Sequence, residues 1–373
     1  MIYLDNAATT RVRGEVLEIM LPFLRDEYGN PSGVYSLARS AHSALDLARE
    51  RVARVLGAEH PREIFFTGCG TESDNWALCC ASGKGGHIVT SKAEHHAVLE
   101  TCAFLEKHGR EVTYIDPDEY GMISPEAVRS AMRENTMLVS IMHANNEVGT
   151  INPIADIAGI VHKHGALFHV DAVQSAGHIP VDVRGMDIDM LSISAHKFHA
   201  PKGVGALYVK SGISLPSFMH GGAQERGRRA GTEGLPSIAG MGLALELAAN
   251  EMKDTESRMT VLRDHLINRL LNEIPESRLN GHPSKRLPGN VNISFKNTKA
   301  ETVLFNLDLM GIAAASGSAC TAGAIGVSHV ISSMRVPGEY AQGAIRFSLS
   351  RYTTLEEIDA AADAVKEIFD NKI

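Results

Sequence analysis

The sequence has few cysteines, no excess of basic residues and no long apolar run. Its five cysteines are an odd number in a chain of 373 residues, which argues against a disulfide framework and favours a reducing cytoplasm. The formal net charge is −8, so we expect neither a strongly basic face nor direct nucleic-acid binding. No segment approaches the roughly 18 apolar residues of a membrane helix. We also expect no signal peptide, because the start has no basic and apolar regions.

The overall composition is ordinary for a globular protein, and the length predicts two domains. The first two thirds alternate helical and strand-like patterns. The strand-like runs are short and apolar without alternation, as in strands that are buried on both faces. This order predicts an α/β fold with a mainly parallel sheet between helices. The expected strands are 63–66, 87–90, 111–115, 136–142, 166–171, 190–194 and 205–209, and the expected helices are 39–56, 70–81, 96–108 and one that begins at Pro125.

The pattern changes near residue 236. One long helical stretch, 236–274, is expected to connect two lobes, and a smaller α+β lobe follows it. The N-terminal dozen residues are expected to pack against that lobe. We therefore predict a large domain at 13–250 and a small domain made of 1–12 and 251–373. The expected elements after the connector are strands 291–295, 311–315 and 344–348 and helices 300–310 and from about 353 onward.

Lys197 follows one apolar strand, and Asp171 ends another. Ligands of open α/β sheets bind beyond the carboxyl ends of the strands, where a lysine can form a Schiff base with an aldehyde cofactor. Asp171 ends a run that should be buried, so its carboxylate needs a partner. The protonated ring nitrogen of pyridoxal 5′-phosphate (PLP) would be one. Considered alone, Lys197 is better explained as a solvated lysine in a turn, and Asp171 has the alternative of capping a helix. Taken together, the two residues favour the cofactor.

Two weaker signals accompany this pair. The turn before Gly70 and Thr71 joins a strand to a helix N-terminus and can hold an anion, although an ordinary turn explains it equally well. His95 follows another strand, where it either stacks on a planar cofactor or is an ordinary packed histidine. The histidine spacing and the absence of a C-x-x-C pair predict no metal site.

Cys320 differs from the other cysteines because it lies in a loop of small residues, ASGSACTAGAIG. A structural cysteine prefers an apolar core, so reactivity is the better explanation of this position. We interpret Cys79, Cys80 and Cys102 as packed or surface thiols. The role of Cys69 stays open.

Ten segments occur in an order that is typical of one family: YLDNAATT, YGNPSG, FTGCGTESDNWAL, EHHAVL, NNEVGTINPI, HVDAVQ, SISAHKFHAPKGVGALYV, GGAQERGRRAGTEG, SGSACTAG and IRFSLS. Nearly end to end, the chain resembles the NifS/IscS-type cysteine desulfurases, which are fold-type I PLP enzymes. The resemblance implies a mainly parallel seven-stranded sheet flanked by helices, with a smaller α+β domain. It departs from the usual pattern at Gly68-Cys69, among other positions.

The resemblance also implies residue roles. Lys197 carries PLP and moves the Cα proton, His95 stacks on the ring and acts as an acid or base, and Cys320 attacks the substrate sulfur. Asp171 pairs with the ring nitrogen and Gln174 with the ring hydroxyl. The phosphate is held by Gly70, Thr71, Ser194 and His196 and by Thr232 of a second subunit, which implies a homodimer. Asn146 and Arg346 bind the substrate carboxylate.

The implied reaction converts L-cysteine to L-alanine and leaves a persulfide on Cys320. The sulfur then passes to an acceptor protein for iron–sulfur cluster assembly or for tRNA or cofactor thiolation. The alternatives are another PLP enzyme of this fold, such as a selenocysteine lyase or an aminotransferase, and a non-catalytic scaffold. Cys320 distinguishes a desulfurase from an aminotransferase, because aminotransfer does not need a cysteine nucleophile. Lys197, Asp171, His95 and Cys320 together speak against a scaffold.

Overall fold

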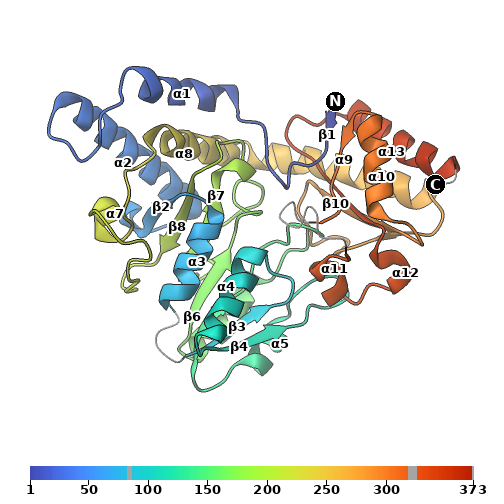
Figure 1. The fold of residues 1–373 in the computed structure, drawn as a ribbon, viewed down its shortest axis with the longest axis horizontal. Helices are drawn as coiled ribbons and strands as arrows, with labels where there is room; N and C mark the ends of the chain where they lie inside the picture. Colours follow the sequence, from blue (N-terminus) through green and yellow to red (C-terminus); the bar gives the residue numbers. More distant parts are fainter. Residues whose placement is uncertain (82–85, 318–325, 372–373) are drawn as a thin grey trace.

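The computed structural model describes residues 1–81, 86–317 and 326–371, which form a large and a small lobe (Figure 1). The large lobe contains a seven-stranded sheet of order β2-β8-β7-β6-β5-β3-β4. Strands β3 to β7 are parallel, and β8 is antiparallel to both neighbours. The prediction of a mainly parallel seven-stranded sheet is therefore confirmed. The strands are β2 (Ile64–Thr67), β3 (His87–Ser91), β4 (Glu111–Ile115), β5 (Thr136–Ser140), β6 (Leu167–Asp171), β7 (Met190–Ser194) and β8 (Gly205–Val209).

Helices cover both faces of this sheet, as the continuous apolar strands require. One face packs in a core with α2 (Ser36–Leu56), α6 (Ile154–Lys163) and α8 (Leu235–Asn250). The other face packs with α3 (Gly70–Ala81) and α4 (His96–Lys107). The remaining helices of the large lobe are α1 (Gly14–Arg25), α5 (Pro125–Ala131) and the short α7 (Gln224–Gly227). The side chain of Ser124 caps α5, as its sequence predicts.

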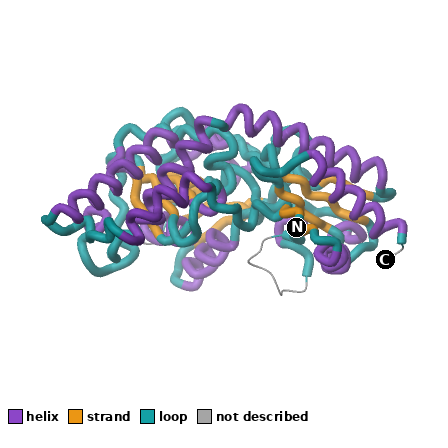
Figure 2. The backbone as a smooth tube through the Cα atoms, turned by 90° about the horizontal axis from the view of Figure 1, so that it is seen from above, coloured by secondary structure: helices purple, strands orange, loops and turns teal. Residues whose placement is uncertain are grey.

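The small lobe has a core of its own. Its strands form a group apart from those of the large lobe (Figure 2). Its antiparallel sheet has the order β12-β10-β9, and β1 pairs with β11 beside it. Leu4 belongs to this core and Ile2 packs against it, whereas Val12 packs against the core of the large lobe. The N-terminal dozen residues are therefore divided between the two lobes. The strands are β1 (Ile2–Tyr3), β9 (Ser277–Leu279), β10 (Asn290–Phe295), β11 (Ile312–Ala313) and β12 (Ala344–Ser348), and the helices are α9 (Met252–Glu273), α10 (Ala300–Leu309), α11 (His329–Ser333), α12 (Gly338–Ala341) and α13 (Leu355–Asp370).

The connector between the lobes differs from the prediction of one continuous helix over 236–274. It consists of α8 and α9, which are separated at Glu251 (φ −101°, ψ 1°). The carboxylate of Glu251 accepts hydrogen bonds from Arg13 and Arg351, so side chains of both lobes hold the break. The domain boundaries given above stay a prediction. In the described part of the chain, no helix combines the length and the apolar character that a membrane crossing needs.

Candidate active site

A pocket of about 180 Å³ lies where the carboxyl ends of the central strands meet the small lobe. It contains every predicted cofactor and substrate residue that the structure describes, apart from Thr232. Adjacent strands supply two of them, because β6 ends at Asp171 and β7 leads directly to Lys197. The lining residues are Ala7, Ala8, Cys69, Gly70, Thr71, Asp74, His95, Met142, Asn146, Asp171, Val173, Gln174, Ser194, His196, Lys197 and Arg346.

The amine of Lys197 is positioned by main-chain oxygens of the N-terminal segment. Its Nζ donates hydrogen bonds to the carbonyls of Ala7 (2.7 Å) and Ala8 (2.8 Å). The amide of Gln174 donates to the same Ala7 carbonyl at 3.0 Å. The N-terminal segment is therefore a wall of the pocket as well as part of the small lobe.

Asp171 is a buried acid with one main-chain donor, since its Oδ1 accepts the N–H of Val173 at 2.8 Å. Burial raises the pKa of Asp171 to about 6, and the Val173 hydrogen bond and the Lys197 charge oppose this effect. A cationic group beside the carboxylate would favour its ionised form. The position thus suits a protonated ring nitrogen.

The N-terminus of α3 forms a close-fitting cradle in the same pocket. A Cβ on Gly70 would lie 2.7 Å from Cγ2 of Val173 and 3.3 Å from Cβ of Ser194, so a larger residue would not fit without movement. Main-chain N–H groups at a helix N-terminus bind anions, and Thr71 and Ser194 add hydroxyl groups. His196 completes the cradle, with its Nδ1 3.2 Å from Oγ1 of Thr9. This donor set fits a phosphate.

His95 is fixed at the start of α4, where its Nδ1 accepts the N–H of Ala97 at 3.1 Å. Burial lowers the pKa of His95 to about 4, with a smaller contribution from the nearby positive charge of Lys197. The ring is therefore neutral at physiological pH and carries its proton on Nε2.

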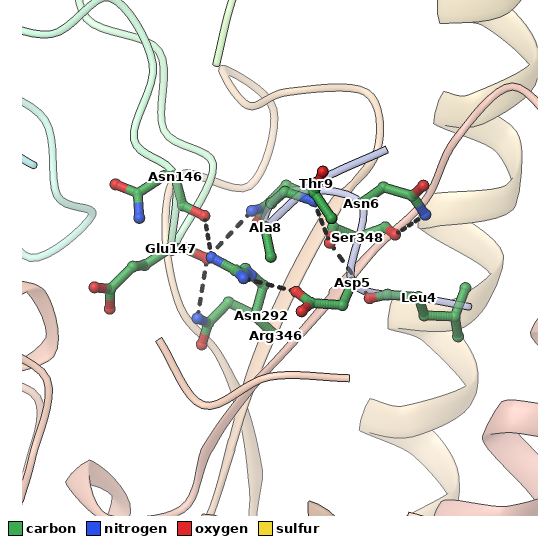
Figure 3. Close-up of polar contacts among 12 residues, drawn as sticks. Leu4, Asp5, Asn6, Ala8, Thr9, Asn146, Glu147, Asn292, Arg346 and Ser348 are labelled. Atoms are coloured by element: carbon green, nitrogen blue, oxygen red, sulfur yellow. Dashed lines mark hydrogen bonds and ion pairs between the residues drawn. The ribbon is translucent and has the colours of Figure 1, made fainter. Parts of the chain in front are cut away.

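Arg346 lies on β12, and 1% of its side chain is exposed. Its Nη1 donates to the carbonyl of Asn146 at 2.9 Å, and its Nη2 lies 2.8 Å from Oδ1 of Asp5 (Figure 3). Both predicted substrate-binding residues, Asn146 and Arg346, therefore lie together at the small-lobe side of the pocket.

One predicted residue that the structure describes is not part of this constellation. Thr232 is exposed and does not line the pocket of its own chain. Cys320 lies outside the described residues.

Sequence reasoning missed Asp74 and the N-terminal carbonyls. A signal for Asp74 existed, because it shares the buried face of α3 with Gly70, Ala77 and Ala81 although it is acidic. The segment YLDNAATT was noticed, but no residue in it was given a role.

Comparison with known proteins assigns the chain to a family. The model of the aminotransferase class-V family matches residues 2–361, and the chain belongs to that family. It is 49% identical over 371 residues to the cysteine desulfurase IscS of Methanosarcina thermophila, covering 98% of this chain and 91% of the relative. It is 48% identical to the IscS of Dictyoglomus turgidum, covering 99% and 94%. A solved NifS-like protein superimposes with a TM-score of 0.93 at 40% identity, covering 99% of both chains.

This full-length similarity identifies a PLP-dependent enzyme with the activity of a cysteine desulfurase. The residues present fit PLP on independent grounds. Asp171 offers a buried carboxylate, the Gly70 turn leaves no room for a Cβ, and Oδ1 of Asp74 has no hydrogen-bond partner among the described residues.

Proposed function

We propose that the pocket around Lys197 carries out the cysteine desulfurase reaction. The observation that carries this proposal is the placement of the Lys197 amine and the Asp171 carboxylate at the ends of adjacent strands in one pocket. Those two groups are what a PLP ring needs, one for its aldehyde carbon and one for its nitrogen.

In this proposal, Asp171 pairs with the ring nitrogen, Gln174 with the ring hydroxyl, and the neutral His95 stacks on the ring. Gly70, Thr71, Ser194 and His196 hold the phosphate. When bound, PLP supplies an electron-withdrawing ring that takes up electron density from the substrate Cα.

The chain's own groups bind the substrate and move protons. Arg346 and Asn146 hold the substrate carboxylate, and the Lys197 amine takes the proton from the substrate Cα. His95 Nε2 is the second proton carrier. Because its ring is neutral above about pH 4 and its Nδ1 accepts from Ala97, Nε2 carries the proton near neutrality and acts as a donor.

Cys320 is the proposed nucleophile. Its thiolate forms an S–S bond with the substrate sulfur while the C–S bond breaks, which leaves a persulfide on Cys320 and, after protonation of the carbon skeleton, L-alanine. A sulfur-acceptor protein for iron–sulfur cluster assembly or for tRNA or cofactor thiolation would then take the sulfur. The proposal also includes a homodimer, in which Thr232 reaches the phosphate of the partner subunit, and a cytoplasmic location.

The test is to incubate the PLP-loaded protein with L-cysteine and a reductant and to measure sulfide and L-alanine. We expect equal amounts from the wild type and neither product from Cys320→Ala. Cys79→Ala is the matched control, because Cys79 lies outside the pocket, and it should keep the activity. A fully active Cys320→Ala variant would rule out Cys320 as the nucleophile. A PLP-loaded wild type without L-alanine production would rule out the substrate.

A further inference from the structure

The carboxylate of Asp5 has no role in the reaction described above, yet it contacts the proposed substrate-binding arginine. Asp5 lies between β1 and the two carbonyls that hold Lys197. Its position is fixed by its neighbours in sequence. The Asn6 side chain donates to the Ser348 carbonyl at 2.8 Å (Figure 3), and the Ala7 N–H donates to Oγ of Ser348 at 2.8 Å. Ser348 and Arg346 belong to the same strand, so the Asp5–Arg346 contact is held by the backbone.

The guanidinium of Arg346 meets one neutral and one charged acceptor. Nη1 binds the Asn146 carbonyl and Nη2 binds Asp5, and the two contacts come from different sides of the group (Figure 3). Nε has no hydrogen-bond partner among the described residues, and it belongs to a side chain that lines the pocket. Within the described ranges, Asp5 is the one acidic residue that forms an ion pair with Arg346.

We infer that Asp5 is the counter-ion that keeps the carboxylate subsite electrically neutral, so that the substrate carboxylate binds to an Asp5–Arg346 ion pair rather than to a bare buried cation. This inference rests on the proposed role of Arg346. Asp5 acts through Arg346 and is thus a positioning residue that sets affinity. Two carboxylates on one guanidinium repel each other, and the low dielectric of a buried site strengthens that repulsion. Asp5 therefore lowers the affinity for the substrate and for L-alanine, which favours product release.

The test removes the charge and keeps the shape. In Asp5→Asn, the side-chain oxygen can still accept from Nη2, but the negative charge is gone. The PLP-loaded protein is titrated with L-alanine and with L-alaninamide, which has no carboxylate, and binding is followed by the visible absorbance of the cofactor. We expect the Kd of L-alanine to fall about tenfold in Asp5→Asn, equivalent to about 1.4 kcal/mol. The Kd of L-alaninamide should not change.

Two further variants serve as controls. Asp5→Glu keeps the charge and should retain the wild-type affinity. Glu15→Gln breaks an ion pair of similar length, 2.9 Å, with the buried Arg13, which does not line the pocket, and should change neither Kd. If unfolding curves show that Asp5→Asn does not fold, Asp5→Ser provides a second uncharged side chain for the same titrations.

The inference is overturned if Asp5→Asn binds L-alanine no more tightly than the wild type, or if it binds both ligands more tightly. Arg346→Gln separates this failure from a failure of the proposed site, because it should weaken the binding of L-alanine and not of L-alaninamide. If Arg346→Gln keeps the wild-type affinity for L-alanine, Arg346 does not bind the substrate carboxylate, and the role inferred for Asp5 is wrong as well. If Arg346→Gln behaves as expected and Asp5→Asn does not, the role of Asp5 alone is wrong.

Discussion

A buried ion pair, Arg49 with Glu225, covers the β2 edge of the large sheet. Nη1 and Nη2 of Arg49 each lie 2.8 Å from one carboxylate oxygen of Glu225, and the two side chains are 8% and 2% exposed. Strand β2 is the last strand of the sheet. On its open side, the Ile64 carbonyl accepts from Arg49 at 2.7 Å, and the Phe66 N–H donates to Glu225 at 3.0 Å. The pair thus takes the place of a neighbouring strand.

The perturbation is a double-mutant cycle of Arg49→Met and Glu225→Gln. Each single variant leaves one buried charge without its partner, which costs about 3–5 kcal/mol of unfolding free energy. The double variant removes both charges, and the amide that replaces the Glu225 carboxylate still offers an oxygen to the Phe66 N–H. The Ile64 carbonyl keeps a donor, because Nη2 of Arg226 lies 2.9 Å from it. We therefore expect the double variant to unfold within about 1–2 kcal/mol of the wild type.

The assay is urea unfolding of the PLP-free proteins, followed by circular dichroism, because bound cofactor would add its own stabilisation. Arg129→Met is the matched control. It breaks an ion pair of 3.0 Å with Glu126 in which both side chains are more than half exposed, so it should cost about 1 kcal/mol or less. The reasoning fails if each single variant costs less than the control, or if the double variant loses the sum of the two single losses.

Two further predictions concern the cofactor pocket. The folded pKa of Asp171, about 6, lies above its unfolded value of about 4, so Asp171 by itself lowers the unfolding free energy of the PLP-free protein as pH rises between these values. Buried histidines such as His95, whose pKa burial lowers to about 4, raise it over the same interval. In urea unfolding at several pH values, the unfolding free energy of Asp171→Asn should therefore increase relative to that of the wild type between about pH 4 and pH 6. Gly70→Ala should weaken PLP binding in an equilibrium titration, because its Cβ would lie 2.7 Å from Val173. Gly159→Ala, whose Cβ meets no atom within 4 Å, should bind PLP like the wild type.

Much of the fold could be predicted because its elements have strong local signals. The strands 190–194, 205–209 and 344–348 and the helix 70–81 have the bounds that were expected. The break at Glu251 was missed because no glycine or proline marks it in the sequence. The contacts of its carboxylate are to Arg13 and Arg351, which are both distant in sequence. Helices α1 and α6 were not predicted, although both are amphipathic.

The site residues also fall into those that the sequence could predict and those that it could not. Lys197 and Asp171 could be predicted because polar residues at the ends of apolar strands must meet at one edge of the sheet. Ala7 and Ala8 could not, because they act through main-chain oxygens that every residue has. The pairing of Asp5 with Arg346 joins residues 341 positions apart, and nothing in the local pattern of either residue identifies the other.

These missed contacts explain how the two lobes share one site. The segment around Ala7 and Ala8 leaves the small lobe, where Leu4 is part of the core, and reaches the amine of Lys197 in the large lobe. Two residues before Ala7, Asp5 holds the guanidinium of Arg346. A fully extended residue spans about 3.3–3.6 Å, so the few peptide units between Asp5 and Ala8 set an upper limit on the separation of the two groups. The segment therefore limits how far the group that moves the Cα proton can lie from the group that holds the substrate carboxylate.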